Sequence, residues 1–270
     1  TLDLKVFTGK AHIVKLREAL LLTGFWVSLA LTFAVLVYSW LGMGKALEYM
    51  TTYLIEWSLS VDNLFVFLVI FTYFSVPREY QRRVLLWGIL GAVFFRGLFI
   101  FAGIALIKKF HFLLYIFGLF LIFTGIKLML REEGEVQPEK NPVLKLFKRF
   151  FPVADSYESE KFFIKKSNTL LATPLFVVLL CIESTDVMFA FDSIPAAFGI
   201  TLDPFIVYAS NIFAILGLRA LFFALAGLFY LFHYLKYGLS IVLVFIGIKM
   251  VLADIYKIPT LIALLVVAAI

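Results

Sequence analysis

Long apolar runs with few or no charges constrain this chain more than any other feature of its sequence. One extends from Leu20 to Trp40 and another from Leu113 to Leu130, and a helix needs about 20 residues to cross the hydrocarbon core of a bilayer. The runs are continuous and not alternating, which excludes a membrane-spanning β-barrel. Hydrophobic residues make up 63% of the chain, whereas soluble domains hold about 45–50%. The sequence therefore predicts an all-α polytopic membrane protein.

The apolar runs, with the Pro and Gly residues between them, predict a single transmembrane domain over 1–270. Helices are expected at about 19–40, 46–74, 84–107, 112–130, 174–193, 204–231, 235–253 and 259–270. Asp203-Pro204 has the pattern of an N-cap followed by proline at the first helical position. The segment 131–169 is the one large hydrophilic stretch, rich in Glu, Lys and Pro. Its composition is typical of a solvated loop.

The two halves of the chain resemble each other at an offset of 122–124 residues. The matched pairs are Ser60–Phe67 with Ser184–Phe191, Arg96 with Arg219, and Phe123–Lys127 with Phe245–Lys249. They define two repeats of three helices, about 46–130 and about 170–253, with flanking helices at about 19–40 and 259–270. Because each repeat has an odd number of helices, the copies would cross the membrane in opposite directions, the inverted repeat of many secondary transporters.

Charged side chains lie inside the apolar runs, where they are costly and indicate function. The acids are Glu56, Asp62, Glu183, Asp186 and Asp192, and the bases are Arg96 and Arg219. If both arginines pair with acids, three carboxylates still lack a fixed partner. Such carboxylates bind protons or hold a cation. The excess of acids therefore predicts a cation site near the middle of the membrane.

Oxygen atoms are the available ligands at this site. On a regular helix Glu56, Ser60 and Asn63 share one face, and Glu183 lies beside Asp186. Pro195 removes a backbone donor near Asp192 and predicts an opening of the helix there. The predicted metal ligands are Glu56, Asp62, Asn63, Glu183, Asp186 and Asp192, supported by Ser60, Ser184, Arg96 and Arg219.

The type of ligand narrows the choice of ion. Carboxylate, amide and carbonyl oxygens suit Mg²⁺, Ca²⁺ or Mn²⁺. The three histidines, His12, His111 and His233, lie in the tail or at helix ends, and Cys181 is the only cysteine. Zinc and copper, which prefer His and Cys, are therefore disfavoured. Met188 could favour Mn²⁺, although a methionine among aromatic residues is more often a packing residue.

The basic residues predict the orientation. Segment 1–18, the Arg78–Arg83 turn, segment 131–169 and Lys236 would lie on one side, and fewer lysines would lie on the other. The positive-inside rule assigns the first side to the cytoplasm. The net charge of +6 is explained by this role and does not imply a nucleic-acid partner. The expected partners are the lipid bilayer and a divalent metal ion.

The stretches Glu56–Phe67 and Glu183–Pro195 resemble the two signature motifs of the TerC (tellurium-resistance protein C) family. The runs Phe74–Pro77, Gln81–Val84 and Ala209–Arg219 are most similar to its Alx-type branch. The resemblance covers about 20–257. It implies a multi-pass protein of the bacterial inner membrane, a role in manganese export, and further membrane helices outside this chain. It also implies that the six predicted ligands are the functional residues.

The two motifs are not equivalent, because Glu56 aligns with Leu180 and Asp192 aligns with Leu68. We therefore expect a lopsided site. The sequence predicts a secondary transporter, and not an enzyme, that exports a divalent cation, foremost Mn²⁺, by alternating access. Protons are the candidate counter-ion, and no prosthetic group is expected.

Three alternatives remain open at this point. A membrane scaffold or insertion factor would use segment 131–169 for partners and would need no ion. A Ca²⁺ or Mg²⁺ carrier fits the same oxygen donors. An intramembrane aspartyl protease is disfavoured, because the Gly-x-Gly-Asp context expected around its aspartates is missing.

Overall fold

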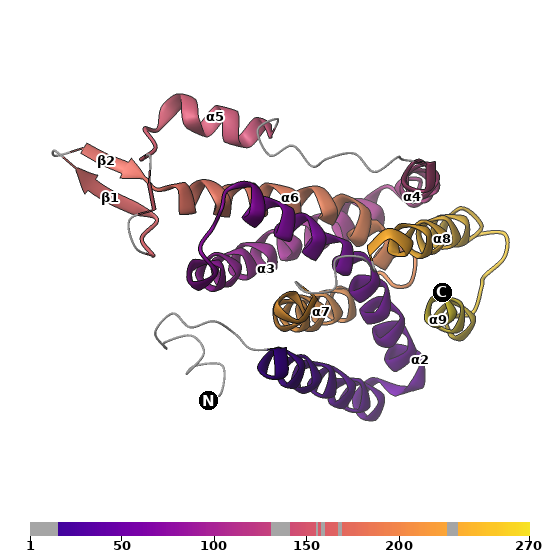
Figure 1. The fold of residues 1–270 in the computed structure, drawn as a ribbon. Helices are drawn as coiled ribbons and strands as arrows, with labels where there is room; N and C mark the ends of the chain where they lie inside the picture. Colours follow the sequence, from indigo (N-terminus) through magenta and orange to yellow (C-terminus); the bar gives the residue numbers. More distant parts are fainter. Residues whose placement is uncertain (1–15, 131–140, 155, 158–159, 167–168, 226–231) are drawn as a thin grey trace.

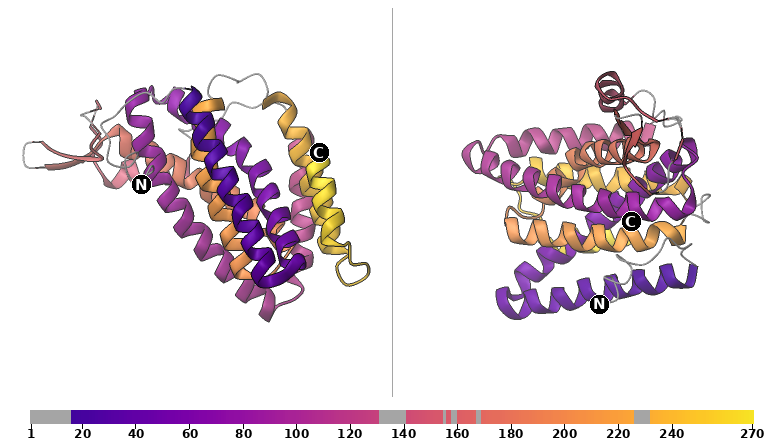
Figure 2. Two further views of the ribbon diagram at one scale, coloured as in Figure 1. Left: turned by 90° about the horizontal axis from the view of Figure 1, so that it is seen from below. Right: turned by 90° about the vertical axis from the view of Figure 1, so that its left-hand side faces the viewer.

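The computed structural model describes residues 16–130, 141–154, 156–157, 160–166, 169–225 and 232–270. The side chains of 62, 166, 219, 223–225 and 232–236 are also outside the description. Within the described part, five helices are long and apolar enough to cross a membrane. The prediction of an all-α polytopic membrane protein is confirmed. The long helices run side by side in one bundle (Figures 1 and 2).

Helix α2 (Leu16–Tyr73) contains both of the first two expected helices, joined at Gly42. Gly42 has a φ of 84°, a conformation that residues with a side chain rarely adopt. This residue turns the chain, so that the first part of α2 lies beside the second (Figure 1). The hydroxyl of Tyr49 donates a hydrogen bond of 3.3 Å to the carbonyl of Ala30. The two parts of α2 are thereby joined across the turn.

The remaining helices of the bundle follow the expected order. They are α3 (Arg78–Lys109), α4 (Leu113–Leu130), α6 (Pro174–Phe198), α7 (Pro204–Leu225), α8 (Phe232–Val251) and α9 (Thr260–Ala269). The Asp203 carboxylate accepts hydrogen bonds from the backbone N–H groups of Phe205 at 3.1 Å and Ile206 at 3.4 Å. The predicted N-cap is confirmed.

The predicted opening of the helix beside Asp192 is wrong, because α6 is helical from Pro174 to Phe198. Pro195 lies inside this helix. It cannot donate a backbone hydrogen bond, but it lies in the last turn, where few further bonds depend on it. Only the Phe191 carbonyl loses its helical donor to this proline, and the helix remains unbroken at Asp192.

The hydrophilic segment 131–169 is more structured than a solvated loop. It contains helix α5 (Pro142–Phe150) and strand β1 (Phe163–Lys166), which pairs antiparallel with β2 (Thr169–Ala172). The interpretation as a loop was thus incomplete. Periodicity did not reveal α5, because only nine residues form it between Pro- and Lys-rich sequence. Residues 131–140 lie outside the described part of the chain.

Segment 141–172 is attached to the membrane helices by aromatic side chains. Phe147 of α5 packs against Phe176 of α6, with ring centroids 5.3 Å apart. The Tyr157 hydroxyl donates a hydrogen bond of 2.7 Å to the carbonyl of Phe74, at the end of α2. Burial raises the pKa of Tyr157 to about 12. The segment is therefore docked on the bundle at the end that carries the α2–α3 turn.

Helices α4 and α8 approach each other closely at three glycines. A Cβ at Gly247 would lie 2.6 Å from the Gly118 carbonyl oxygen, and one at Gly125 would lie 2.8 Å from that of Ser240. In the repeat alignment, with an offset of 122 residues, Gly118 corresponds to Ser240 and Gly125 to Gly247. The contact between Gly118 and Gly247 therefore corresponds to the contact between Ser240 and Gly125. A two-fold axis between α4 and α8 would produce this pattern. The inverted repeat as a whole stays a prediction.

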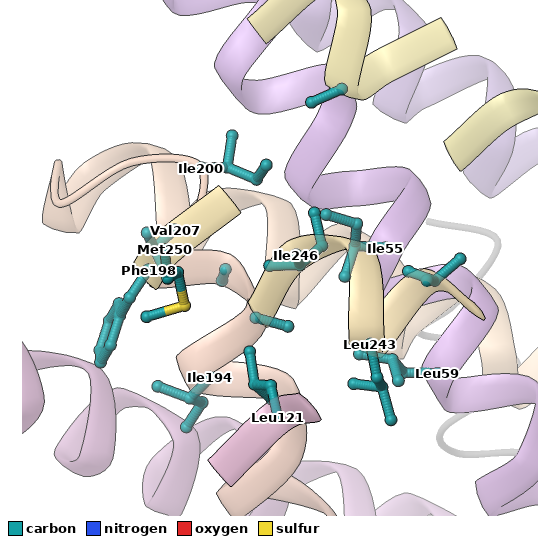
Figure 3. Close-up of a cluster of buried hydrophobic side chains, with 14 of the residues drawn as sticks. Ile55, Leu59, Leu121, Ile194, Phe198, Ile200, Val207, Leu243, Ile246 and Met250 are labelled. Carbon is teal, nitrogen blue, oxygen red and sulfur yellow. The ribbon is translucent and has the colours of Figure 1, made fainter. Parts of the chain in front are cut away.

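Apolar side chains form two main clusters, one toward each end of the bundle. The first includes Ile100 of α3, Ala190 of α6 and Val207 of α7, and Figure 3 shows much of it. The second includes residues from the same helices on the side of α5, namely Leu85, Ile182 and Leu218. On each of these helices, polar residues lie between the two clusters. Charged groups therefore occupy a buried level between two apolar regions.

Candidate functional site

Arg96 of α3 is the centre of the buried polar level. Its Nη1 donates to Glu56 Oε2 of α2 at 2.5 Å and to Asn211 Oδ1 of α7 at 2.9 Å. Its Nη2 and Nε donate to Asp186 Oδ1 and Oδ2 of α6 at 3.2 and 3.4 Å. We call these four residues the Arg96 cluster. Helices α2, α3, α6 and α7 each supply one member.

The Arg96 cluster is almost fully shielded from the surroundings. Arg96, Glu56 and Asn211 are at most 1% exposed, and Asp186 is 7% exposed. One guanidinium is shared by two carboxylates, so the ionised cluster carries one excess negative charge. Buried carboxylates are tolerated only when paired and hydrogen-bonded. Arg96 thus pairs with two of the acids that lie inside the apolar runs.

Two oxygen atoms beside the cluster have no hydrogen-bond partner among the described residues. They are Glu56 Oε1 and the hydroxyl oxygen of Ser60, one turn further along α2. Ser60 is fully buried and Asn63 is 5% exposed, as the shared helical face predicted. Buried polar atoms are usually satisfied, so these oxygens are available to a ligand.

Glu183 adds a third carboxylate next to the cluster. It lies one turn before Asp186 on α6 and against Gly91 of α3, so closely that a side chain at Gly91 would overlap its carboxylate. The buried Oε2 atom has no hydrogen-bond partner in the described part of the protein. The carboxylates of Glu56, Glu183 and Asp186 therefore lie near one guanidinium among the described side chains.

The structure does not bring all predicted ligands together. Asp192 lies six residues beyond Asp186, about 9 Å along the helix, and its carboxylate faces Thr124 and Lys127 of α4. Met188 is 65% exposed on the outside of the bundle. The side chains of Asp62 and Arg219 are outside the described residues. Within the described ranges, no group of three or more His, Cys, Asp or Glu is arranged to hold a metal ion.

Sequence reasoning missed Asn211 as a member of the cluster. The available signal was an amide within a long apolar helix, the same signal that singled out Asn63. Its Nδ2 donates to the Val207 carbonyl of its own helix at 3.2 Å, which fixes the orientation of the amide. Asn211 is thus a positioned acceptor for Arg96.

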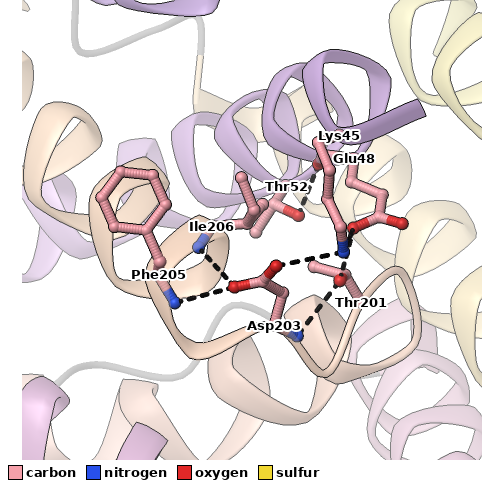
Figure 4. A network of polar contacts seen from close by, with 7 residues as sticks. All are labelled: Lys45, Glu48, Thr52, Thr201, Asp203, Phe205 and Ile206. Carbon is pink, nitrogen blue, oxygen red and sulfur yellow. Dashed lines mark hydrogen bonds and ion pairs between the residues drawn. The ribbon is translucent and has the colours of Figure 1, made fainter. Parts of the chain in front are cut away.

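Figure 4 shows a second polar network, which sequence reasoning also missed. Lys45 of α2 contacts Glu48 at 2.7 Å and Asp203 at 3.1 Å. The Thr201 hydroxyl donates to Glu48 Oε2 at 2.6 Å. The network joins α2 to the connection between α6 and α7. Of these residues, sequence reasoning singled out only Asp203, as a helix N-cap.

Ser184, a predicted supporting residue, connects α6 to segment 141–172. The Nδ2 of Asn141 donates to the Ser184 hydroxyl oxygen at 2.6 Å. Asn141 is also the N-cap of α5, because its Oδ1 accepts from the backbone N–H groups of Val143 and Leu144. One amide therefore starts α5 and attaches it beside the acidic motif.

Replacing Asn141 with alanine is expected to loosen α5. Loss of an N-cap costs about 1 kcal/mol, which corresponds to roughly a fivefold rise in the open population. Trypsin cleavage at Lys145 and Lys148 should accelerate by about that factor in the purified protein. Asn141→Asp keeps the capping oxygen but loses the donor to Ser184, and should retain most of the protection. Equal cleavage of wild type and Asn141→Ala would contradict the capping role.

The fold and this buried site define a class: a multi-pass helical membrane protein with a carboxylate–guanidinium cluster between its spans. Residues 41–270 match the model of the "Integral membrane protein TerC family", and the chain belongs to this family. No solved structure matches the chain.

The relatives are similar over most of their length. A membrane protein of Myxococcus xanthus is 51% identical over 267 residues, which cover 99% of this chain and 84% of that protein. The Salmonella typhi protein named "Putative membrane-bound redox modulator Alx" is 48% identical over 94% of this chain and 81% of its own length. A membrane protein of Rickettsia bellii is 43% identical over 97% of this chain and 87% of its own length. The resemblance to the Alx-type branch is confirmed.

Proposed function

We propose that this protein is a secondary transporter that exports a divalent metal cation, Mn²⁺, across the inner membrane. The observation that carries the proposal is that Glu56 and Asp186, on different helices, share a single guanidinium deep in the bundle. Glu183 lies one turn away without a described partner for its buried oxygen. This arrangement leaves negative charge that a cation or protons must balance.

The donor set supports a hard or borderline divalent ion. Carboxylate, amide and hydroxyl oxygens suit Mn²⁺, Mg²⁺ and Ca²⁺. The choice of Mn²⁺ rests on the resemblance to the TerC family. In this proposal Glu56 and Asp186 bind the ion, with Ser60 and Asn63 as further donors. Asp192 faces α4 here and would join only after α6 moves, and Asp62 remains a proposed ligand.

Proton exchange follows from the third carboxylate. The buried Oε2 atom of Glu183 has no hydrogen-bond partner among the described residues, and Glu183 is the proposed proton carrier. It would gain a proton when the metal leaves and lose it when the metal returns. Under the positive-inside rule, the end of the bundle that carries α5 faces the cytoplasm. The network around Lys45 would then lie on the release side.

The name of the Salmonella relative includes a redox role, which suggests a second candidate function. Reversible disulfide chemistry within one chain requires two cysteines, and these 270 residues contain one, Cys181. It is 1% exposed, whereas reactive thiols are accessible. We therefore propose that any effect on cellular redox state arises through metal export.

The transport test uses the purified protein in liposomes, with Mn²⁺ flux read by an internal fluorescent dye. Glu56→Gln and Asp186→Asn should each lower the flux at least tenfold, because each removes one ionic ligand. Glu160→Gln is the matched control, since Glu160 forms only a half-exposed contact of 3.5 Å with Arg83. Parallel runs with Ca²⁺ and Mg²⁺ identify the preferred ion. Unchanged flux in both acid variants would reject the proposed site and would favour the alternative function as a membrane scaffold or insertion factor.

A further inference from the structure

We propose that Arg96 is a built-in counter-cation that occupies the metal position between Glu56 and Asp186, and that Asn211 positions it there. Binding of the metal and engagement of Arg96 would exclude each other. Arg96 would thus set the affinity of the site and expel the ion during transport. This inference rests on the proposed function and assigns a regulatory role within the same site.

The first argument is the occupancy of the carboxylate oxygens. Both oxygens of Asp186 accept from Arg96, at 3.2 and 3.4 Å, and Glu56 Oε2 accepts at 2.5 Å. A divalent ion with oxygen ligands needs these atoms at about 2.0–2.6 Å. The guanidinium would then lie within a few ångströms of the ion and repel it, because little water screens charges at this depth. The metal can bind only after Arg96 withdraws.

The second argument is that Arg96 cannot withdraw by losing its proton. Arginine remains charged at any physiological pH, so the charge must move away from the acids. The guanidinium is held by three groups from three other helices, Glu56, Asp186 and Asn211. Separation of α2 from α6 would weaken this hold. A conformational change is therefore coupled to the exchange of one cation for the other.

The third argument concerns the neutral member of the cluster. Asn211 carries no charge and its amide is fixed by the Val207 carbonyl, yet it accepts from the same Nη1 that contacts Glu56. If Asn211 were a metal ligand, its hydrogen bond to Arg96 would not be explained. It serves to keep the guanidinium between the two acids. Asn211 is thus a positioning residue for Arg96.

The test measures Mn²⁺ binding to the purified protein in lipid nanodiscs, with free Mn²⁺ followed by its electron paramagnetic resonance signal. Asn211→Ala should tighten binding about tenfold, because the competing guanidinium loses one acceptor. Arg96→Lys should tighten Mn²⁺ binding as well, since a compact ammonium group cannot bridge both carboxylates as the planar guanidinium does. Ser210→Ala is the control: Ser210 is equally buried, and its hydroxyl donates to the Val207 carbonyl of its own helix.

Transport kinetics separate this role from a purely structural one. In Asn211→Ala, both the KM for Mn²⁺ and the maximal rate should fall, because the ion is held more tightly and expelled more slowly. Damage to the fold would raise KM instead. Equal or weaker binding in Asn211→Ala and Arg96→Lys, with wild type binding Mn²⁺, would overturn the role of Arg96 and leave the proposed function intact. Lack of binding by wild type would instead refute Mn²⁺ transport itself.

Discussion

Replacing Arg96 with leucine is expected to lower the free energy of unfolding by about 3–5 kcal/mol, because it leaves two buried carboxylates without their counter-charge. Glu56 is fully buried and Asp186 nearly so, so water cannot replace the lost contacts. Thermal unfolding of the purified protein in detergent, followed by light scattering or dye binding, measures the loss.

Neutralising the acids should reverse much of this loss. Adding Glu56→Gln and Asp186→Asn to the Arg96→Leu variant removes both unpaired charges and should recover most of the lost stability. A buried ion network can often be replaced by neutral groups at little cost. If Arg96→Leu alone were as stable as wild type, the cluster would not be ionised and buried as described.

The second large effect is expected at the contact between α4 and α8. Gly247→Ala places a Cβ 2.6 Å from the Gly118 carbonyl oxygen and 2.8 Å from Ile122. The two backbones must then separate, and such overpacking costs about 1–3 kcal/mol. The same thermal measurement should show a lower midpoint.

Gly24→Ala is the matched control for this substitution. Gly24 lies within α2, and a Cβ there would meet nothing within 4 Å. In a helix, alanine is favoured over glycine by about 1 kcal/mol, so this variant should be slightly more stable than wild type. A loss of stability in Gly247→Ala together with a gain in Gly24→Ala would establish the close contact between α4 and α8. A gain at Gly247 would show that α4 and α8 are further apart.

The helices themselves were largely predictable. A segment that crosses lipid must satisfy its backbone hydrogen bonds internally, so an apolar run of sufficient length becomes a helix. The break near Gly42 and the N-cap at Asp203 were also found, because both depend on local backbone chemistry. The short helix α5 was missed, since its position depends on packing against α6 and on the contact of Asn141 with Ser184.

The site was predicted in its composition but not in its connections. The chain alone placed Glu56, Asp186 and Arg96 in the membrane and showed that acids outnumber bases. Only the structure showed that Asn211 belongs to the cluster, through its hydrogen bond with Arg96. It also showed that Asp192 faces α4 and not the cluster. The helix break expected at Asp192 failed because a proline in the last turn removes little of the helix.

The sequence by itself determined which segments form long apolar helices, where the chain turns between them, and that Asp and Glu outnumber Arg within them. These properties follow from residue type and local backbone chemistry. Only the tertiary structure decided that one guanidinium joins Glu56 to Asp186, because the rotation of each helix about its axis sets which side chains meet. That rotation is fixed by contacts between helices, such as Gly91 against Glu183 and Gly118 against Gly247, between residues far apart in the chain.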